Sequence, residues 1–321
     1  MFTDRKVCSR LFKTLVPVTL LLFTAGCERH PAGVRRETAQ APFIRYKVES
    51  YRQTREILDR LGYSEEAFQK GMKEIPPVLL TKISARWNEE AKKIPVAEKK
   101  SLFLRLLAAG ALMADAEVLQ ERKHLLELLR KMEEGEISPK ESRWLRRLAL
   151  KYRILKSPDG ILTPAGLKEL RRRVDIVPPS LIVAQGAIES AWGTSRFAVE
   201  GNALFGQWHY GGDAMKPKKQ RKELGDYGLA RFKTPLDSIR AYLLNLNTYP
   251  AYRPFRDLRA KLRAEGKPLD GKLLAGTLTR YSERGEAYVE DLRRLIRANR
   301  LGWLDRAKLK KMKPVYIHPD R

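Results

Sequence analysis

The chain has 321 residues, of which 64 are Lys or Arg and 38 are Asp or Glu, so its formal net charge at pH 7 is +26. Such a charge can indicate nucleic-acid binding. The basic residues, however, are spread among acidic ones along segments with helical spacing, and no nucleic-acid motif is present. We therefore expect no nucleic-acid partner. The four histidines are not paired at metal-ligand spacing, so we expect no metal and no cofactor.

The N-terminal segment has the pattern of a bacterial secretory signal. Several basic residues precede an apolar run at 15–23, and the small residues 24–26 come directly before Cys27. The run is too short to span a bilayer comfortably. The sequence before Cys27 resembles a lipobox, although Thr24 stands where Leu is commoner. We expect residues 1–26 to be a lipoprotein signal peptide and Cys27 to carry the lipid.

This interpretation places the protein in the bacterial cell envelope, as a membrane-anchored lipoprotein that faces the periplasm. The alternatives are a plain secreted protein or an uncleaved inner-membrane anchor, with Cys27 incidental. Cys8 would leave with the signal, so the mature chain has no internal disulfide. Basic charge suits this location, because lipid and cell-wall surfaces are anionic.

The first half of the mature chain is expected to be helical. Residues 27–45 are polar and irregular and predict a flexible tether. Residues 46–160 predict a helical N-terminal region, whose longest helix runs from about Val96 towards Leu129. Ser138 to Glu141 form a capping box with Pro at the first helical position, which opens a helix over 139–152.

One segment in the second half places a carboxylate in unusual surroundings. Pro178 and Pro179 open a mostly apolar helix that Ser180 is expected to cap, and the helix is broken at Gly193. Glu189 lies in its last turn, where the helix dipole disfavours negative charge. The apolar neighbours disfavour ionisation further, so both effects raise the expected pKa of Glu189. A carboxyl with a raised pKa beside Trp192 has the environment of a general acid, although a surface Glu at a frayed helix end is the alternative.

The rest of this half predicts a small β element within further helices. Residues 204–210 and 226–233 show alternation with flanking glycines, which favours a short hairpin. Residues 301–321 are basic and contain Pro, and we expect them to be a mobile basic C-terminal tail. Helices are predicted over the four ranges 235–248, 255–265, 269–280 and 284–299.

Two motifs then identify a family. Residues 189–195 read E-S-A-W-G-T-S and residues 202–206 read N-A-L-F-G. They resemble the "ESxWGxS … NxLFG" signature of the glucosaminidase domain, the family-73 glycoside hydrolases. Segments 173–178 and 241–252 narrow the resemblance to the Bax-type branch of bacterial cell-envelope proteins. It is strong over about residues 165–300 and weaker over about 75–155.

The resemblance implies a mainly α fold with a small β-lobe, in the two-lobed arrangement of lysozyme. Residues 161–300 would form the glucosaminidase domain, with Glu189 on the helical lobe and the hairpin opposite. It also implies an endo-β-N-acetylglucosaminidase that cleaves β-1,4 bonds of peptidoglycan glycan strands, with Glu189 as general acid. An amide-cleaving reaction is disfavoured, because the chain shows no metal triad and no activated Cys or Ser.

Glycoside hydrolysis needs a second group at the anomeric carbon, and the sequence leaves its identity open. Glu223 and Asp226 lie just before the second strand of the hairpin and could face the site; Asp213 is a further acid nearby. Each is equally well an ordinary loop carboxylate. If the substrate carries a 2-acetamido group, that group can take the role instead.

Tyr281 is the residue that we expect to steady such an acetamido group. It opens a segment, residues 281–288, that resembles the family's "Y-x-x-D/G-x-x-Y" motif, whose first Tyr belongs to the site. Tyr281 could also simply pack, with its hydroxyl bonded to backbone. Tyr288 is interpreted as a packing residue.

Aromatic faces and amides bind sugars, and four residues are candidates for this role: Trp192, Asn202, Trp208 and Tyr210. Trp192 is equally a core residue, and Asn202 equally caps the turn before Leu204. The family usually has a second Asn where this chain has Ala203. That departure, with the uncertain second acid, keeps a competing hypothesis open: a non-catalytic envelope protein that binds glycan strands or a partner through the same groove.

Overall fold

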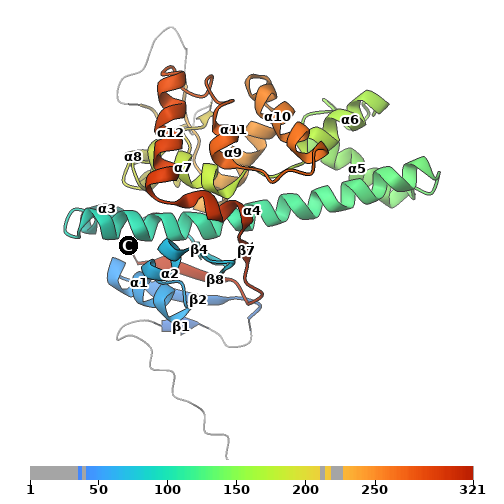
Figure 1. Ribbon diagram of the computed structural model, residues 1–321. Coiled ribbons are helices and arrows are strands. Elements are labelled where there is room, and N and C mark those ends of the chain that lie inside the picture. Colours follow the sequence, from blue (N-terminus) through green and yellow to red (C-terminus); the bar gives the residue numbers. More distant parts are fainter. Residues whose placement is uncertain (1–34, 38–40, 210–213, 218–226, 321) are drawn as a thin grey trace, which may run out of the picture. The chain divides into compact units, whose positions relative to one another are not determined.

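The computed structural model describes residues 35–37, 41–209, 214–217 and 227–320. Its longest element is helix α4, Val96–Glu133 (Figure 1). The first half of α4 is buried on nearly every side because it packs against strand β4, Val78–Leu80, and against helices α7, Pro179–Glu189, and α9, Pro235–Thr248. A Cβ atom on Gly110 would lie 2.8 Å from Cδ1 of Ile239, so the small side chains of α4 permit this close approach. An apolar surface all round is what such a buried helix requires.

The predicted fold class is confirmed, because the described residues are mainly helical with few short strands. Most helices of the second half also lie where the sequence places them, although α11 ends earlier than predicted. The remaining helices, including two 3₁₀ helices labelled η, are α1 Tyr51–Arg60, α2 Glu65–Lys70, α3 Ala85–Glu90, α5 Pro139–Lys151, α6 Pro164–Arg173, α8 Arg196–Gly201, η2 Pro250–Tyr252, α10 Arg253–Ala264, α11 Gly271–Ala275, α12 Glu286–Ala298 and η3 Leu301–Arg306.

Helix α5 begins as predicted, and helix α6 begins in the same way, with Pro164 in its first turn. Ser138 and Glu141 form the capping box of α5, and Thr163 caps α6. These helices pack against the far half of α4 and form a second, smaller hydrophobic core. Its fully or nearly fully buried members are Leu125, Leu128, Leu145, Leu148, Ala149, Tyr152, Leu155, Leu170 and Val174.

A four-stranded sheet lies on the other side of α4, with the strand order β1-β2-β8-β4. β2 and β4 run parallel to β8, and β1 runs antiparallel to β2. A second, two-stranded parallel sheet joins β3 to β7. The bounds of these strands are β1 Arg35–Glu37, β2 Ile44–Val48, β3 Glu74–Ile75, β7 Lys308–Leu309 and β8 Val315–Pro319.

The two sheets correct the predictions for three segments, 27–45, 46–160 and 301–321. The C-terminal residues 301–321 are not a mobile tail over their described part, because β8 lies between two other strands and both Val315 and Ile317 are fully buried. The expected tether, 27–45, contributes β1 and the start of β2, and the helical region 46–160 contains strands β3 and β4. The alternation of buried and exposed residues in β8 is short, and basic residues and prolines surround it in the sequence. The segment forms a strand because it pairs with β2 and β4.

The predicted hairpin is present in its described residues. Strands β5, Trp208–His209, and β6, Gly228–Leu229, pair antiparallel, with Trp208 opposite Leu229. The four-stranded sheet lies elsewhere in the chain, in segments for which the sequence predicts a helical region, a tether and a mobile tail. The two-lobed arrangement of lysozyme stays a prediction.

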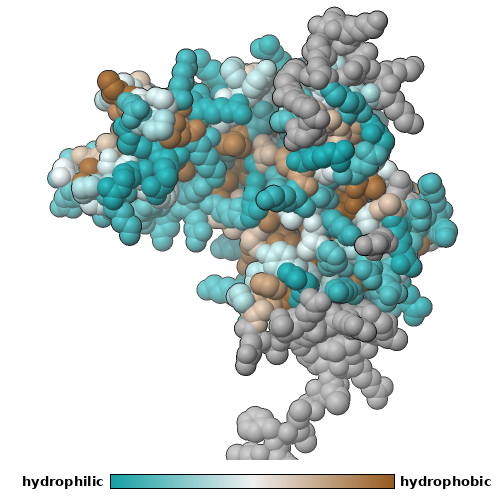
Figure 2. All heavy atoms as spheres, turned by 180° about the vertical axis from the view of Figure 1, so that it is seen from behind, coloured by the Kyte–Doolittle hydropathy of each residue, from teal (hydrophilic) through white to brown (hydrophobic). Residues whose placement is uncertain are grey.

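The face of the molecule seen in Figure 2 is largely hydrophilic, with hydrophobic residues in scattered groups. Many of the charged side chains pair with neighbours one helical turn away, such as Arg130 with Glu134 and Arg196 with Glu200. This is the pattern of solvated helix faces. No helix in the described part of the chain is both long and apolar enough to cross a membrane.

Candidate active site

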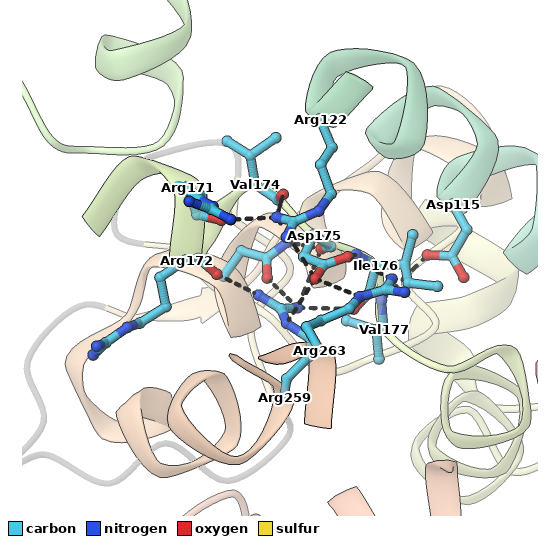
Figure 3. Close-up of polar contacts among 11 residues, drawn as sticks. Asp115, Arg122, Arg171, Arg172, Val174, Asp175, Ile176, Val177, Arg259 and Arg263 are labelled. Atoms are coloured by element: carbon cyan, nitrogen blue, oxygen red, sulfur yellow. Dashed lines mark hydrogen bonds and ion pairs between the residues drawn. The ribbon is translucent and has the colours of Figure 1, made fainter. Parts of the chain in front are cut away.

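Helix α7 carries the motif and is held at its start by a cluster of arginines around the buried Asp175 (Figure 3). Arg263 donates two hydrogen bonds to the Asp175 carboxylate, at 3.1 and 2.9 Å. Arg259 donates to the backbone carbonyls of Asp175 and Ile176 at 3.1 and 2.8 Å, and Arg122 donates to that of Val174. Because these bonds come from α4 and α10, the segment that enters α7 is fixed to both helices.

The first turn of α7 is capped from a distance and not by its own serine. Pro178 occupies the N-cap position without a side-chain hydrogen bond, so the prediction that Ser180 caps the helix is wrong. Asp305 of η3 accepts hydrogen bonds from the Ser180 amide and hydroxyl, at 2.9 and 2.8 Å. A carboxylate is favourable there because the N-terminal amides of a helix carry partial positive charge.

The last turn of α7 leads into a sharp reversal of the chain. Ala191, Trp192 and Gly193 take φ values of 49°, 61° and 76°, three left-handed residues in succession. The Ser190 hydroxyl holds this turn, since it donates to the Gly186 carbonyl and accepts from the Gly193 amide at 2.8 Å. Left-handed backbone at two non-glycine residues is strained, and such strain concentrates at functional sites. The turn fixes the position of Glu189 immediately before it.

The carboxyl of Glu189 is partly buried and has an aromatic, uncharged environment. Its Oε1 accepts a 2.7 Å hydrogen bond from the hydroxyl of Tyr288 in α12. Its Oε2 faces Gly206, where an added Cβ would lie 3.7 Å away. No ion pair to Glu189 is found among the described residues. Burial raises the pKa of Glu189, and the hydrogen bond from Tyr288 opposes that rise without cancelling it.

Tyr288 and Gln185 are site residues that the sequence analysis missed. Tyr288 is not only a packing residue, because it bonds to Glu189, and its own oxygen accepts a 2.9 Å bond from Nε2 of Gln185. One local signal was available: Gln185 and Glu189 are four residues apart and therefore share a face of α7. The contact with Tyr288 could not be read locally, since it depends on the packing of α12 against α7.

Tyr281 lies beside Tyr288, and their rings are parallel with centroids 5.6 Å apart. The Tyr281 hydroxyl donates a 3.0 Å hydrogen bond to the Phe205 carbonyl, as in the packing alternative. Burial, and then the neighbouring Tyr288 and Glu189, raise the pKa of Tyr281 well above its usual range. Tyr281 therefore stays a neutral hydroxyl next to the acid, with oxygen lone pairs still free to accept.

The candidate sugar-binding residues fall into two groups. Trp208 has 53% of its surface exposed and stacks on Tyr227, with ring centroids 4.7 Å apart. Trp192 instead lies against α4, where it meets the ring of Phe103 and lies 4.7 Å from Nζ of Lys100.

Asn202 ends helix α8 in the left-handed conformation, with φ 52°. Its side-chain oxygen accepts from the Ile83 amide at 2.8 Å, and its nitrogen donates to the carbonyls of Phe232 and Lys233. These bonds tie the hairpin to the strand side of α4. They favour the structural alternative for Asn202 over substrate binding.

Several predicted residues lie outside the described residues: Cys27, Tyr210, Asp213, Glu223 and Asp226. Their roles stay predictions. Within the described part of the chain, no cluster of His, Cys, Asp or Glu is arranged to hold a metal ion.

The comparisons with known proteins can now be placed on this site. Residues 165–301 match the glucosaminidase family, described as mannosyl-glycoprotein endo-beta-N-acetylglucosaminidase. The chain is also 32% identical to Protein bax of Escherichia coli (strain K12) over 208 residues. The matched segment covers 63% of this chain and 72% of that protein. The chain belongs to the Bax-type glucosaminidase-domain family. The family match contains α7, its turn, the hairpin and both Tyr281 and Tyr288. No solved structure matches the chain.

Proposed function

We propose that this glucosaminidase-domain protein is an endo-β-N-acetylglucosaminidase of the cell envelope, which cleaves β-1,4 bonds of peptidoglycan glycan strands with Glu189 as general acid. One observation carries the proposal: the motif carboxyl is partly exposed, has a raised pKa and makes no ion pair with a described residue. A general acid must hold its proton near neutral pH until the leaving oxygen takes it. Family membership supports the reaction class.

We propose different tasks for the two oxygens of Glu189. Oε1 accepts the hydrogen bond from Tyr288, and Oε2 makes no hydrogen bond with a described residue. In the protonated acid, Oε2 is therefore the oxygen that presents the proton to the glycosidic oxygen. As the C–O bond breaks, the resulting carboxylate keeps the Tyr288 donor, which stabilises the new negative charge.

The second group is proposed to come from one of two sources. The 2-acetamido carbonyl of the substrate can attack the anomeric carbon, with Tyr281 beside it to steady the acetamido group. Alternatively, Glu223 or Asp226 supplies a second carboxylate. Among the described residues, burial raises the pKa of Glu189, the Tyr288 hydroxyl lowers it and no acid affects it. Glu223 and Asp226 lie outside the described residues, so both routes stay part of the proposal.

The same proposal extends to binding and location. We propose that Trp208 supports a sugar ring, because it is exposed and stacked on Tyr227. Tyr210, the second aromatic candidate, follows it closely in the sequence. Lipidation of Cys27 would hold the domain at the membrane, next to its polymer substrate.

Zymography of the purified full chain on cell walls tests the proposal. The wild type is expected to clear the gel, and Glu189→Gln to abolish clearing while it still folds and binds walls. Glu286→Gln, the same change at an exposed position at the start of α12, is the matched control and should clear normally. If the wild type binds walls but releases no reducing ends, the non-catalytic glycan-binding hypothesis replaces this one.

A further inference from the structure

A line of hydrogen bonds runs through the core and ends on Glu189. The Tyr242 hydroxyl, from α9, donates to Oε1 of Gln185 on α7. Nε2 of Gln185 donates to the Tyr288 oxygen at 2.9 Å, and the Tyr288 hydroxyl donates to Oε1 of Glu189 at 2.7 Å. Tyr242 and Gln185 are fully buried, and Tyr288 is 2% exposed. Buried polar groups with every partner in place rigidify what they contact.

The line has a direction. A glutamine amide has one end that only accepts and one that only donates. Since Tyr242 donates to the oxygen of Gln185, the nitrogen of Gln185 must face Tyr288. The Tyr288 oxygen accepts from that nitrogen, so the one hydrogen of its hydroxyl goes to Glu189. With the amide reversed, Tyr288 would donate to Gln185, and Oε1 of Glu189 would have to supply its own proton to Tyr288.

We propose that Gln185 is a positioning residue for the acid: it fixes the Tyr288 hydroxyl as a donor to Oε1 of Glu189, so that the transferable proton resides on Oε2. Tyr242 sets the orientation of Gln185 and is the second member of this relay. The inference rests on the proposed role of Glu189 as general acid.

The hydrogen bond at the end of this relay is the main contact through which the pKa of Glu189 can change. Among the described residues, the titratable groups that influence Glu189 or respond to its charge are tyrosines, namely Tyr242, Tyr252, Tyr281 and Tyr288. Burial favours the protonated acid and the Tyr288 bond favours the ionised one. If the Tyr288 hydrogen turns away from Glu189, the pKa of Glu189 rises and the acid stays protonated to higher pH.

Two variants of the full chain test the relay. Gln185→Glu is isosteric, puts a competing acceptor on Tyr288 and adds a like charge, so it should raise the pKa of Glu189 by about one unit or more. Tyr242→Phe adds no charge and frees the amide to reverse, so it should shift the pKa the same way by less. Tyr63→Phe is the control, because its buried hydroxyl donates to the Arg105 carbonyl and, within the described part of the chain, makes no hydrogen bond with a member of this line.

The readouts are the high-pH limb of kcat/KM and the ¹³C carboxyl titration of labelled glutamate, assigned with Glu189→Gln. The inference predicts that both shift to higher pH in Gln185→Glu and Tyr242→Phe, whereas Tyr63→Phe loses thermal stability without any shift. The titration needs no turnover, so it tests the relay even if the wild type proves inactive and the proposed function fails. Unchanged titration of Glu189 in both variants would overturn the inference.

Discussion

A buried carboxylate and a partly buried one, at opposite ends of the α7 segment, have opposite electrostatic surroundings. Asp175, before the helix, is surrounded by Arg122, Arg259 and Arg263. Burial raises the pKa of Asp175, but the guanidinium groups outweigh it and the net pKa is lowered. Glu189, in the last turn, has tyrosines in place of arginines, and its pKa is raised.

The difference separates structural from chemical use of a carboxylate. Asp175 is ionised at physiological pH, because its pKa is lowered, and it therefore carries no proton to donate. Its ion pairs hold the segment that enters α7 against two other helices. Glu189 makes no ion pair with a described residue, and in the proposed function it donates its proton. Within one fold, two acids can take different roles when their surroundings shift their pKa values in opposite directions.

The largest expected effect in stability comes from Asp175→Asn. The change leaves the guanidinium of Arg259, which is 1% exposed, without its counter-charge. Breaking such a buried pair typically costs about 3–5 kcal/mol of unfolding free energy. Urea denaturation at pH 7 measures it, and Asp257→Asn is the control, since its partner Arg172 lies at a more exposed site where about 0–1 kcal/mol is expected.

The pH dependence of Asp175 has a defined sign. Because its folded pKa is lowered, its stabilisation is present above the pKa of the unfolded chain and is lost as pH falls through the folded pKa. Asp175→Asn should therefore lose most relative to wild type at neutral pH and little at strongly acidic pH. An equal loss at both would contradict the assignment.

Asp115 sharpens the comparison, because it is a buried acid that makes one hydrogen bond and no ion pair with the described residues. Its Oδ1 accepts from the Val177 amide at 3.3 Å, and its Oδ2 has no partner among the described residues. Burial raises the pKa of Asp115 well above its usual range, so wild-type stability falls as pH rises towards the folded pKa. Asp115→Asn removes that cost and should be more stable at pH 8, by about 1 kcal/mol or more, and nearly neutral at pH 4. Thermal unfolding at both pH values measures this difference. A loss of stability at pH 8 would mean that Asp115, like Asp175, stabilises the fold as an ionised carboxylate.

Arg263→Lys is a milder change to the arginine cluster. It keeps the charge beside Asp175 but loses the two-pronged guanidinium contact, at a side chain that is 37% exposed. We expect a loss of about 1 kcal/mol in urea denaturation. A loss as large as that of Asp175→Asn would show that Arg263, and not Arg259, carries most of the pairing.

The smallest expected stability effect is that of Glu189→Gln. The amide keeps an oxygen for the Tyr288 hydrogen and removes a carboxyl whose raised pKa costs stability as pH rises. Unfolding free energy at pH 7 should stay within about 0.5 kcal/mol of wild type or increase. A loss of several kcal/mol would mean that Glu189, like Asp175, is a structural acid.

Local signals in the sequence predicted the parts of the fold that local chemistry determines. The caps of α5 and α6 follow from Ser138 and Thr163, each before a Pro at the first helical position. The direction of the pKa shift of Glu189 could be predicted, because its helix is apolar and buried. Its contact in the structure is Tyr288, and not Trp192.

Long-range packing accounts for what the sequence did not predict. Strand β8 exists because it pairs with β2 and β4, which lie far away in the chain, and parallel pairing leaves no local turn signal. In the same way, Asp305 caps α7 from η3 and Tyr288 reaches Glu189 from α12. Each contact joins residues that only the folded core brings together.

The most direct test of the central claim measures sugar ends released from purified peptidoglycan by wild type and Glu189→Gln, with mass spectrometry of the products. The account predicts soluble fragments that end in reducing N-acetylglucosamine, and a loss of rate of about 10²–10⁴-fold in the folded variant. Release of the same fragments by Glu189→Gln at the wild-type rate would contradict it.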